Sequence, residues 1–413
     1  MTPLARLLIA SQFAFNVGFF AVVPYLADHL GGTLGLGGAM VGLVLGLRTF
    51  SQQGLFVVGG ALTDRYGPRP VVLVGCALRV AGFCWLAGAA TAGTVVGAVV
   101  LVGFAAALFS PAVESEIARE ALRVERSGGP RRTRTLARFS AGGQAGALLG
   151  PVIGTLLLYA GGDGAFRTAC LVGAAVFVLV LAAHAWLMPG GGGAGGTGAA
   201  AGGGAVAAGR LVLGNRRFLL LALAYATYLL AYNQLYLALP AELDRATGSQ
   251  AALGWLFALS SVLVVCGSAP LERLAAARLS RTGMVRAGLL LIAGAFGATA
   301  VLRELPGPAA AVAFTVLLTL GQMLVLPATR ALLPDLVDER RLGLFTGALS
   351  SLSGLLVLAA GAPIGALLDV GGAVPWLVLG ALPLLATVVV PRGAERGRGG
   401  DGSEEGEAAR VGA

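Results

Sequence analysis

Long apolar stretches recur along the whole chain, and they restrict its fold more than any other feature. Each approaches the ~20 residues that an α-helix needs to cross the ~30 Å hydrocarbon core of a bilayer. Of the 413 residues, 57% are hydrophobic and only 12% are charged, whereas soluble domains carry roughly 25% charged residues. The sequence therefore predicts an all-α, polytopic membrane protein.

The apolar stretches predict twelve transmembrane helices. We expect them near residues 7–27, 39–61, 71–91, 94–117, 138–159, 167–187, 217–239, 250–271, 285–302, 308–330, 343–367 and 375–391. Counting an arginine within two residues of a span end with the adjoining loop, 24 of the 29 basic residues fall on the side of the termini and three on the other side; the remaining two lie well inside spans. Because basic loops remain in the cytoplasm, we expect both termini there. All 29 are arginine, which together with abundant Ala and Gly suggests a GC-rich bacterial genome, so the expected membrane is a bacterial cytoplasmic membrane.

The chain divides into two similar halves. Pro24 recurs as Pro240, and "GPVIGTLLL" from Gly150 recurs as "GAPIGALLD" from Gly361, at nearly one offset. Between the halves, a run of Gly and Ala without packing side chains predicts a flexible tether. We expect four parts: a six-helix bundle (1–188), a cytoplasmic Gly/Ala-rich linker (189–210), a second six-helix bundle (211–391) and a disordered cytoplasmic tail (392–413). This layout is typical of major facilitator transporters.

The stretch "GGALTDRYGPRP", between the second and third spans, resembles the loop signature of the major facilitator superfamily. The matching residues are Gly60, Asp64, Arg65, Gly67 and Arg69. Gly67 permits a tight turn, and Asp64 can lie near helix N-terminal amides of the other half. The two arginines can pair with Glu116 or Glu120, or with anionic lipid. The resemblance implies that this loop holds one conformation of the transporter, although Pro68 stands where the family usually has a basic residue.

The fifth span contains a second signature. Its residues Gly146, Gly150, Pro151 and Gly154 match the G-x-x-x-G-P-x-x-G pattern of the antiporters of this family. The alternative is ordinary helix packing, since small residues four apart let a neighbouring helix approach closely. Pro151 also frees a carbonyl and kinks the helix.

The second and third spans, "VGLVLGLRTFSQQGLFVVGGALTDRYGPRPVVLVGCALRVAGF", resemble the quinolone-exporting bacterial members of the drug:proton antiporters. The resemblance implies proton-coupled export of drugs. The arginine that the family usually has in span four is absent, because "LVGFAAALFSPAVESEIARE" contains none before Arg119.

Polar and aromatic residues within the spans indicate a substrate cavity. Placing Arg48 or Arg79 within a span costs roughly 2.5–3.5 kcal/mol each on insertion scales, so each must face water or a partner; Arg79 could alternatively extend to the membrane surface. In span seven, tyrosines at 225, 228, 232 and 236 follow one helix face, although such aromatics also simply pack helices together. The predicted cavity residues are Asn16, Phe20, Arg48, Gln52, Tyr228, Tyr232 and Asn233.

Charges near the cytoplasmic ends of spans four and ten suggest a gate. Glu114 and Glu116 follow Pro111, and Arg330 follows the repeat-related Pro327. We expect one of the acids to pair with Arg330 and close the cytoplasmic side, and one acid or Arg79 to take part in proton coupling. The alternative is that these side chains reach to the membrane surface.

The sequence thus predicts a secondary active multidrug efflux transporter that exchanges drug for protons by alternating access. The alternatives are an exporter of one endogenous metabolite, a proton-coupled nutrient symporter and a non-transporting receptor. An enzyme is not expected, because no nucleophile–base pair, metal cluster or phosphate loop is present. We expect no cofactor, with the proton gradient as energy source, and no metal. The expected partners are an amphipathic or cationic drug, protons and the bilayer but no nucleic acid, and the protein is expected to be a monomer.

Overall fold

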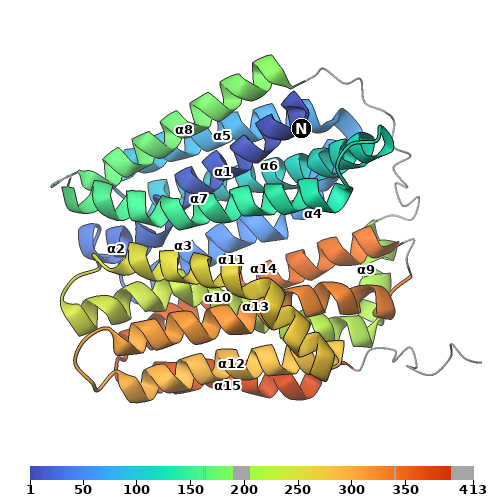
Figure 1. Ribbon diagram of the computed structural model, residues 1–413. Coiled ribbons are helices and arrows are strands. Elements are labelled where there is room, and N and C mark those ends of the chain that lie inside the picture. The colour runs from blue at the N-terminus through green and yellow to red at the C-terminus, as the bar shows by residue number, and fades with distance from the viewer. Residues whose placement is uncertain (161, 163, 189–204, 339–340, 392–413) are drawn as a thin grey trace, which may run out of the picture.

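The computed structural model describes residues 1–391 apart from 161, 163, 189–204 and 339–340. Its described part consists of helices and contains no strand (Figure 1). The first half comprises α1 (Pro3–Phe20), η1 (Val23–Tyr25), α2 (Leu26–Asp28), η2 (His29–Thr33), α3 (Gly38–Thr49), η3 (Phe50–Gly54), α4 (Phe56–Tyr66), α5 (Pro68–Ala87), α6 (Ala92–Arg126), α7 (Arg132–Ala160) and α8 (Ala165–Leu187). The second half comprises α9 (Ala205–Gly214), α10 (Arg216–Thr247), α11 (Leu253–Arg278), α12 (Arg281–Leu302), α13 (Ala309–Leu336), α14 (Leu342–Asp369) and α15 (Val374–Val389).

The helices confirm the predicted multi-pass membrane architecture. Eleven continuous helical stretches are long and apolar enough to cross a bilayer, and α15 is a shorter apolar helix at the position of the twelfth predicted span. Several helices extend beyond the predicted spans. The longest, α6, has 35 residues because its charged C-terminal part remains helical.

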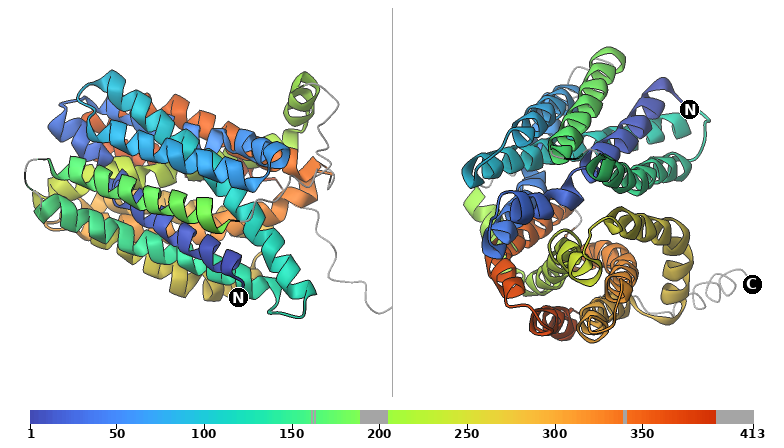
Figure 2. Two further views of the ribbon diagram at one scale, coloured as in Figure 1. Left: turned by 90° about the horizontal axis from the view of Figure 1, so that it is seen from above. Right: turned by 90° about the vertical axis from the view of Figure 1, so that its left-hand side faces the viewer.

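The two halves form two layers that lie side by side (Figures 1 and 2). We call the end where the chain begins and where α9 lies the linker end; it includes residues 67, 127–131 and 279–280 and is on the right in Figure 1. The opposite end, with the turns at 34–37, 88–91 and 248–252, is the far end. The halves contact one another mainly through α3 with α14 and through α7 with α11.

A helix begins within the stretch predicted as a linker. Residues 189–204 lie outside the described part, as does the predicted tail at 392–413. From Ala205 the chain forms α9, which includes the last six residues of the predicted linker. The physical reason is local composition. The "AVAAGRLVLG" segment consists mostly of Ala, Leu and Val, and of these Ala and Leu favour helix.

Span two contains a π-helical turn at η3, which begins two residues after Arg48. In a regular α-helix the Val58 amide would donate to the Gly54 carbonyl. Here the Val58 amide donates to the Leu55 carbonyl (3.0 Å), and the Gly54 carbonyl accepts a hydrogen bond from the Ser351 hydroxyl of α14 (2.7 Å). Single π turns inside α-helices occur frequently at functional sites. Here the turn gives the backbone of one half a hydrogen bond to the other half.

Glycines let α3 and α14 approach backbone to backbone. A Cβ atom at Gly42 would overlap the carbonyl oxygen of Gly361, and a Cβ atom at Gly361 would overlap that of Gly42. Small residues at four-residue spacing allow such close approach in membranes. This contact fixes the interface on which the central pocket depends.

Candidate functional site

A pocket of about 160 Å³ lies between the two halves, at the C-terminal end of α1 and midway along α10. Three segments form it: α1, the α3–η3 stretch and α10. Its lining residues are Phe15, Asn16, Phe19, Phe20, Arg48, Thr49, Gln52, Gln53, Leu229, Tyr232, Asn233 and Tyr236. The structure therefore brings together six of the seven residues predicted for the cavity.

Tyr228 is the predicted cavity residue that does not line this pocket. It is buried, and its ring lies between those of Tyr225 (5.5 Å between centroids) and Tyr232 (6.2 Å). The tyrosine stripe thus continues from the pocket toward the linker end. At the other end of the stripe, Tyr236 does line the pocket; its hydroxyl lies 3.4 Å from that of Tyr232. The i+4 spacing of the stripe was a signal that could have identified Tyr236.

Arg48 is the charged group of the pocket and is only 6% exposed. Its guanidinium lies over the ring of Tyr236 (4.7 Å to the centroid) and near that of Phe19 (5.5 Å). Nη2 donates to the Thr49 hydroxyl (3.1 Å), which in turn lies 3.0 Å from Asn233 Oδ1 on the other half. Nε and Nη1 have no hydrogen-bond acceptor in the described structure. Arg48 therefore connects the halves through Thr49, while two of its buried donors remain unsatisfied.

Arg79 is enclosed behind the pocket wall and is 1% exposed. It does not extend to the membrane surface, the alternative that the sequence left open. Four phenylalanine rings surround its guanidinium at 4.6–5.4 Å, namely those of Phe15, Phe19, Phe83 and Phe177. Nη1 donates to the Val102 carbonyl (2.6 Å), while Nε and Nη2 have no acceptor in the described structure. Phe19 lies against both buried guanidiniums, so Arg79 supports a ring that lines the pocket.

Neither buried arginine has a carboxylate partner among the described residues. The ion pairs of this part of the chain join Arg119, Arg123, Arg245, Arg281 and Arg303 to acids near the two ends of the bundle. A guanidinium does not lose its proton in proteins. The middle of the bundle therefore carries two uncompensated positive charges.

The predicted gate residues lie on opposing helices but do not form an ion pair in this structure. Glu114 on α6 and Arg330 on α13 are exposed and interact electrostatically, while Glu116 pairs with Arg119 at 3.7 Å. Arg330 also interacts electrostatically with Tyr225 and Tyr228. These groups thus surround the linker-end side of the tyrosine stripe.

The halves are joined at the far end. Gln250 donates from Nε2 to Asp28 Oδ1 (2.9 Å), and the Gly38 amide donates to Asp369 Oδ2 (3.0 Å). Near these contacts, a Cβ atom at Gly254 would lie 2.7 Å from the Pro151 carbonyl oxygen. At the linker end, Glu114 and Arg330 form no ion pair in the described structure. The two halves are therefore joined more tightly at the far end than at the linker end.

The loop signature adopts a different arrangement from the one expected. Gly67 has φ +84°, the left-handed region that favours glycine. Arg69 donates to the Ala185 carbonyl near the end of α8 (2.8 Å), and Arg65 lies over the Tyr66 ring (5.3 Å). Neither arginine pairs with an acid in the described structure, and Asp64 is exposed. Gly60 is also in this segment, with open space where a Cβ would lie.

The acids proposed as partners of that loop are already engaged. Glu116 pairs with Arg119 as described above, and Glu120 accepts from Arg123 Nη1 (2.7 Å) and from the Thr2 hydroxyl (2.5 Å). Partners one helical turn away satisfy these carboxylates at a lower entropic cost than a distant loop. The pairing of the loop arginines with these acids is therefore not part of this conformation.

The fifth-span signature packs α7 against α1. Cβ atoms at Gly146, Gly150 and Gly154 would all overlap α1 or the segment that follows it. The Pro151 carbonyl accepts a hydrogen bond from the Tyr25 hydroxyl (2.5 Å) and lies beside Gly254 of α11. The signature thus positions the helix that bounds the interface with the second half, which is the packing role considered as the alternative.

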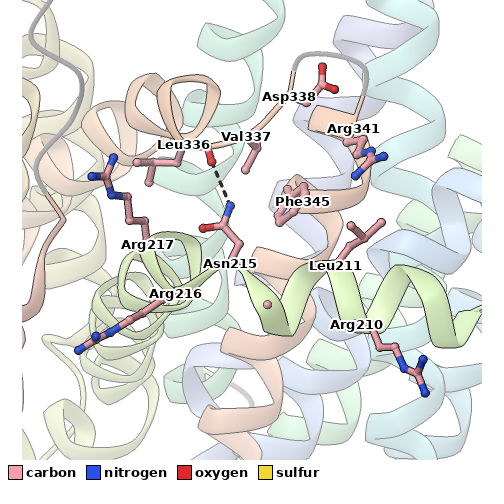
Figure 3. A pocket seen from close by; sticks show the side chains of 11 residues that line it. Arg210, Leu211, Asn215, Arg216, Arg217, Leu336, Val337, Asp338, Arg341 and Phe345 are labelled. Atoms are coloured by element: carbon pink, nitrogen blue, oxygen red, sulfur yellow. Dashed lines mark hydrogen bonds between the residues drawn. The ribbon is translucent and has the colours of Figure 1, made fainter.

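A larger pocket, of about 590 Å³, lies at the linker end (Figure 3). It is lined by Arg210, Leu211, Gly214, Asn215, Arg216, Arg217, Leu336, Val337, Asp338, Arg341 and Phe345. Asn215 donates from Nδ2 to the Leu336 carbonyl (3.0 Å) at its floor. All these residues belong to α9 and the second half, whereas the smaller pocket is formed by both halves.

Twelve apolar helices in two bundles, with a polar and aromatic pocket between them, define a membrane transporter of the two-bundle class. The family model of the Major Facilitator Superfamily matches residues 8–241. An uncharacterized MFS-type transporter of Mycobacterium tuberculosis H37Rv is 35% identical over 88% of this chain and 86% of its own. Multidrug resistance protein MdtH of Citrobacter koseri is 31% identical over 89% of each chain. The chain belongs to the major facilitator superfamily and is a transporter rather than an enzyme.

Solved structures agree on the fold. The crystal structure of a peptide transporter POT in complex with sulfate has a TM-score of 0.77 and covers 94% of this chain and 93% of that one, at 16% identity. A mutant of the nucleoside transporter NupG has a TM-score of 0.75 and covers 94% of this chain and 98% of that one, at 13% identity. At these low sequence identities, the similarity shows a shared fold only.

Proposed function

We propose that this protein exports amphipathic small molecules across a bacterial cytoplasmic membrane in exchange for protons, by alternating access. The observation that carries the proposal is the pocket around Arg48, which both halves form and which lies midway along the bundle. A site between the halves near the midplane is what alternating access requires, because relative motion of the halves exposes it to each side in turn. The multidrug resistance relatives support an exported drug-like substrate.

The orientation follows from the arginines. The linker end carries most of them, which supports a cytoplasmic position for that end and for both termini. The far-end contacts then face outward, so this conformation corresponds to a state closed to the outside. Ligands shift such an equilibrium only if they bind its two states differently.

A pair between Glu114 and Arg330 is our candidate for closing the cytoplasmic side. We expect Glu114→Arg and Arg330→Glu each to reduce transport about tenfold, because each places two like charges across the gate. The double variant should recover most of the activity, since the attraction is restored with its sign exchanged. Transport assays on the three variants and on the unmodified protein test this pairing. If the double variant transports no faster than the single variants, the pair is not part of the mechanism.

The exchange itself is tested in proteoliposomes with an imposed pH gradient. Fluoroquinolones and ethidium are added in turn while the internal pH is followed, with empty liposomes and Arg48→Ala as controls. Substrate-dependent proton movement that the variant lacks supports drug:proton exchange through this pocket. If no compound causes proton movement in liposomes that contain folded protein, the proposed drug:proton exchange is contradicted.

A further inference from the structure

The central pocket contains a full positive charge and no negative one. Arg48 lines it with two donor nitrogens that have no acceptor in the described structure. Leaving buried donors unsatisfied destabilises a protein, and more so when the donors belong to a charged group. The described part of the chain supplies no carboxylate within ion-pair distance, so this donor set fits an acceptor brought by the ligand.

The remaining polar residues of the pocket also suit an anion. Asn16, Gln52, Gln53 and Asn233 contribute amide groups that can turn their NH₂ toward an oxyanion. Arg79 adds a second positive charge on the other side of Phe19. Opposite charges a few ångströms apart attract strongly in a partly dry site, and like charges repel one another equally strongly. The site therefore disfavours a cationic ligand, one of the two kinds of drug expected from the sequence.

The walls of the pocket are aromatic. Phe15, Phe19, Phe20, Tyr232 and Tyr236 all contribute rings. Offset and edge-to-face contacts with such rings favour a flat aromatic ligand. An aromatic body and an acidic group thus fit the two kinds of surface that the pocket offers.

We propose that the transported substrates are aromatic carboxylates, whose carboxylate binds the free N–H groups of Arg48 at the interface of the halves. The proposal rests on the proposed function in taking this pocket as the transport site. The carboxylate neutralises Arg48, accepts from the unsatisfied donors and stabilises the state in which the pocket is formed. Charge-assisted hydrogen bonds of this type are about twice as strong as neutral ones.

The test compares two probes that differ only in charge, 1-naphthoic acid and 1-naphthamide. Binding to the purified protein in detergent is measured by equilibrium dialysis at neutral pH. We expect the acid to bind at least tenfold more tightly than the amide, and this preference to disappear in Arg48→Gln. Arg48→Lys, which keeps the charge but not the planar donor set, should retain part of it. Arg281→Gln, a surface arginine paired with Asp335, serves as matched control and should bind like the unmodified protein.

Equal binding of the two probes, or a preference for the acid that survives in Arg48→Gln, overturns the proposal. The binding assay does not depend on transport. If the acid binds through Arg48 but no compound is moved in proteoliposomes, the proposed function fails, and only the carboxylate-binding role of Arg48 stands. If neutral or cationic compounds are moved as fast as the acid, the inference fails and the proposed function stands.

Discussion

Joining positions 28 and 250 by a short covalent link is expected to stop transport almost completely. Asp28 and Gln250 lie on opposite halves and are joined by a 2.9 Å hydrogen bond at the far end. A link between cysteines at these positions prevents the halves from separating there, so the pocket cannot open to that side. We expect at least a tenfold loss of transport when Asp28→Cys/Gln250→Cys is treated with a reducible bifunctional thiosulfonate, and recovery on reduction.

The background for this experiment lacks the native cysteines, of which Cys84 and Cys266 are exposed. A matched link within one half is provided by Arg281→Cys/Asp335→Cys, whose native side chains pair at 2.7 Å between α12 and α13. That link should leave transport unchanged, because the two helices move together. Full activity in the linked 28–250 protein would show that the far end does not open during the cycle.

Replacing Arg79 by methionine is expected to separate stability from function. The side chain is buried among four phenylalanine rings with two unsatisfied nitrogens. Methionine has a similar length, makes favourable sulfur–aromatic contacts and removes a buried charge; replacing buried charges by apolar groups is often neutral or stabilising. We expect an unchanged or higher melting temperature, with about 2–4 °C gained per kcal/mol, and at least a tenfold loss of transport.

The loss of transport in Arg79→Met has two expected causes. The variant removes the second positive charge near the pocket and one of the two guanidiniums that hold the Phe19 ring. Leu78→Met, on the same helix and partly buried, is the control and should change neither quantity. Thermal unfolding in detergent and transport in proteoliposomes provide the two measurements. A variant that melts much lower yet still transports would assign Arg79 to the fold alone.

The membrane fold could be predicted from the sequence because a bilayer imposes a length and a composition on every span. The bilayer also explains why cavity residues could be predicted, since polar groups such as Arg48 and Asn233 are costly in a membrane unless they face a cavity or partner. The repeat of the halves was predicted from motifs that recur at nearly one offset. Helix ends were less predictable. The charged end of α6 and the start of α9 remain helical, although hydropathy marks neither.

Other features depend on spatial neighbours that the sequence does not reveal. The enclosure of Arg79 requires rings from α1, α5 and α8. The pocket residues Phe15, Phe19, Thr49 and Leu229 were missed because each is an ordinary packing residue until the neighbouring helix is placed. Gln53 was missed although it is a polar residue within the second predicted span. The absence of an acid near Arg48 is likewise a property of the assembled bundle, as far as the structure describes it. That absence is the reason for proposing an aromatic carboxylate where the sequence predicts an amphipathic or cationic drug.

The pocket around Arg48 is expected to face the two sides of the membrane in turn. Gln52 lines this pocket and is partly exposed, so Gln52→Cys in a cysteine-free background reports access to it. The measurement is its reaction with a membrane-impermeant, charged thiosulfonate applied from each side of oriented vesicles, with and without the 28–250 link. We predict reaction from both sides in the unlinked protein, and from the linker-end side alone once the link is formed. Reaction from a single side in the unlinked protein, or unchanged reaction from the far-end side after linking, would contradict alternating access through this pocket.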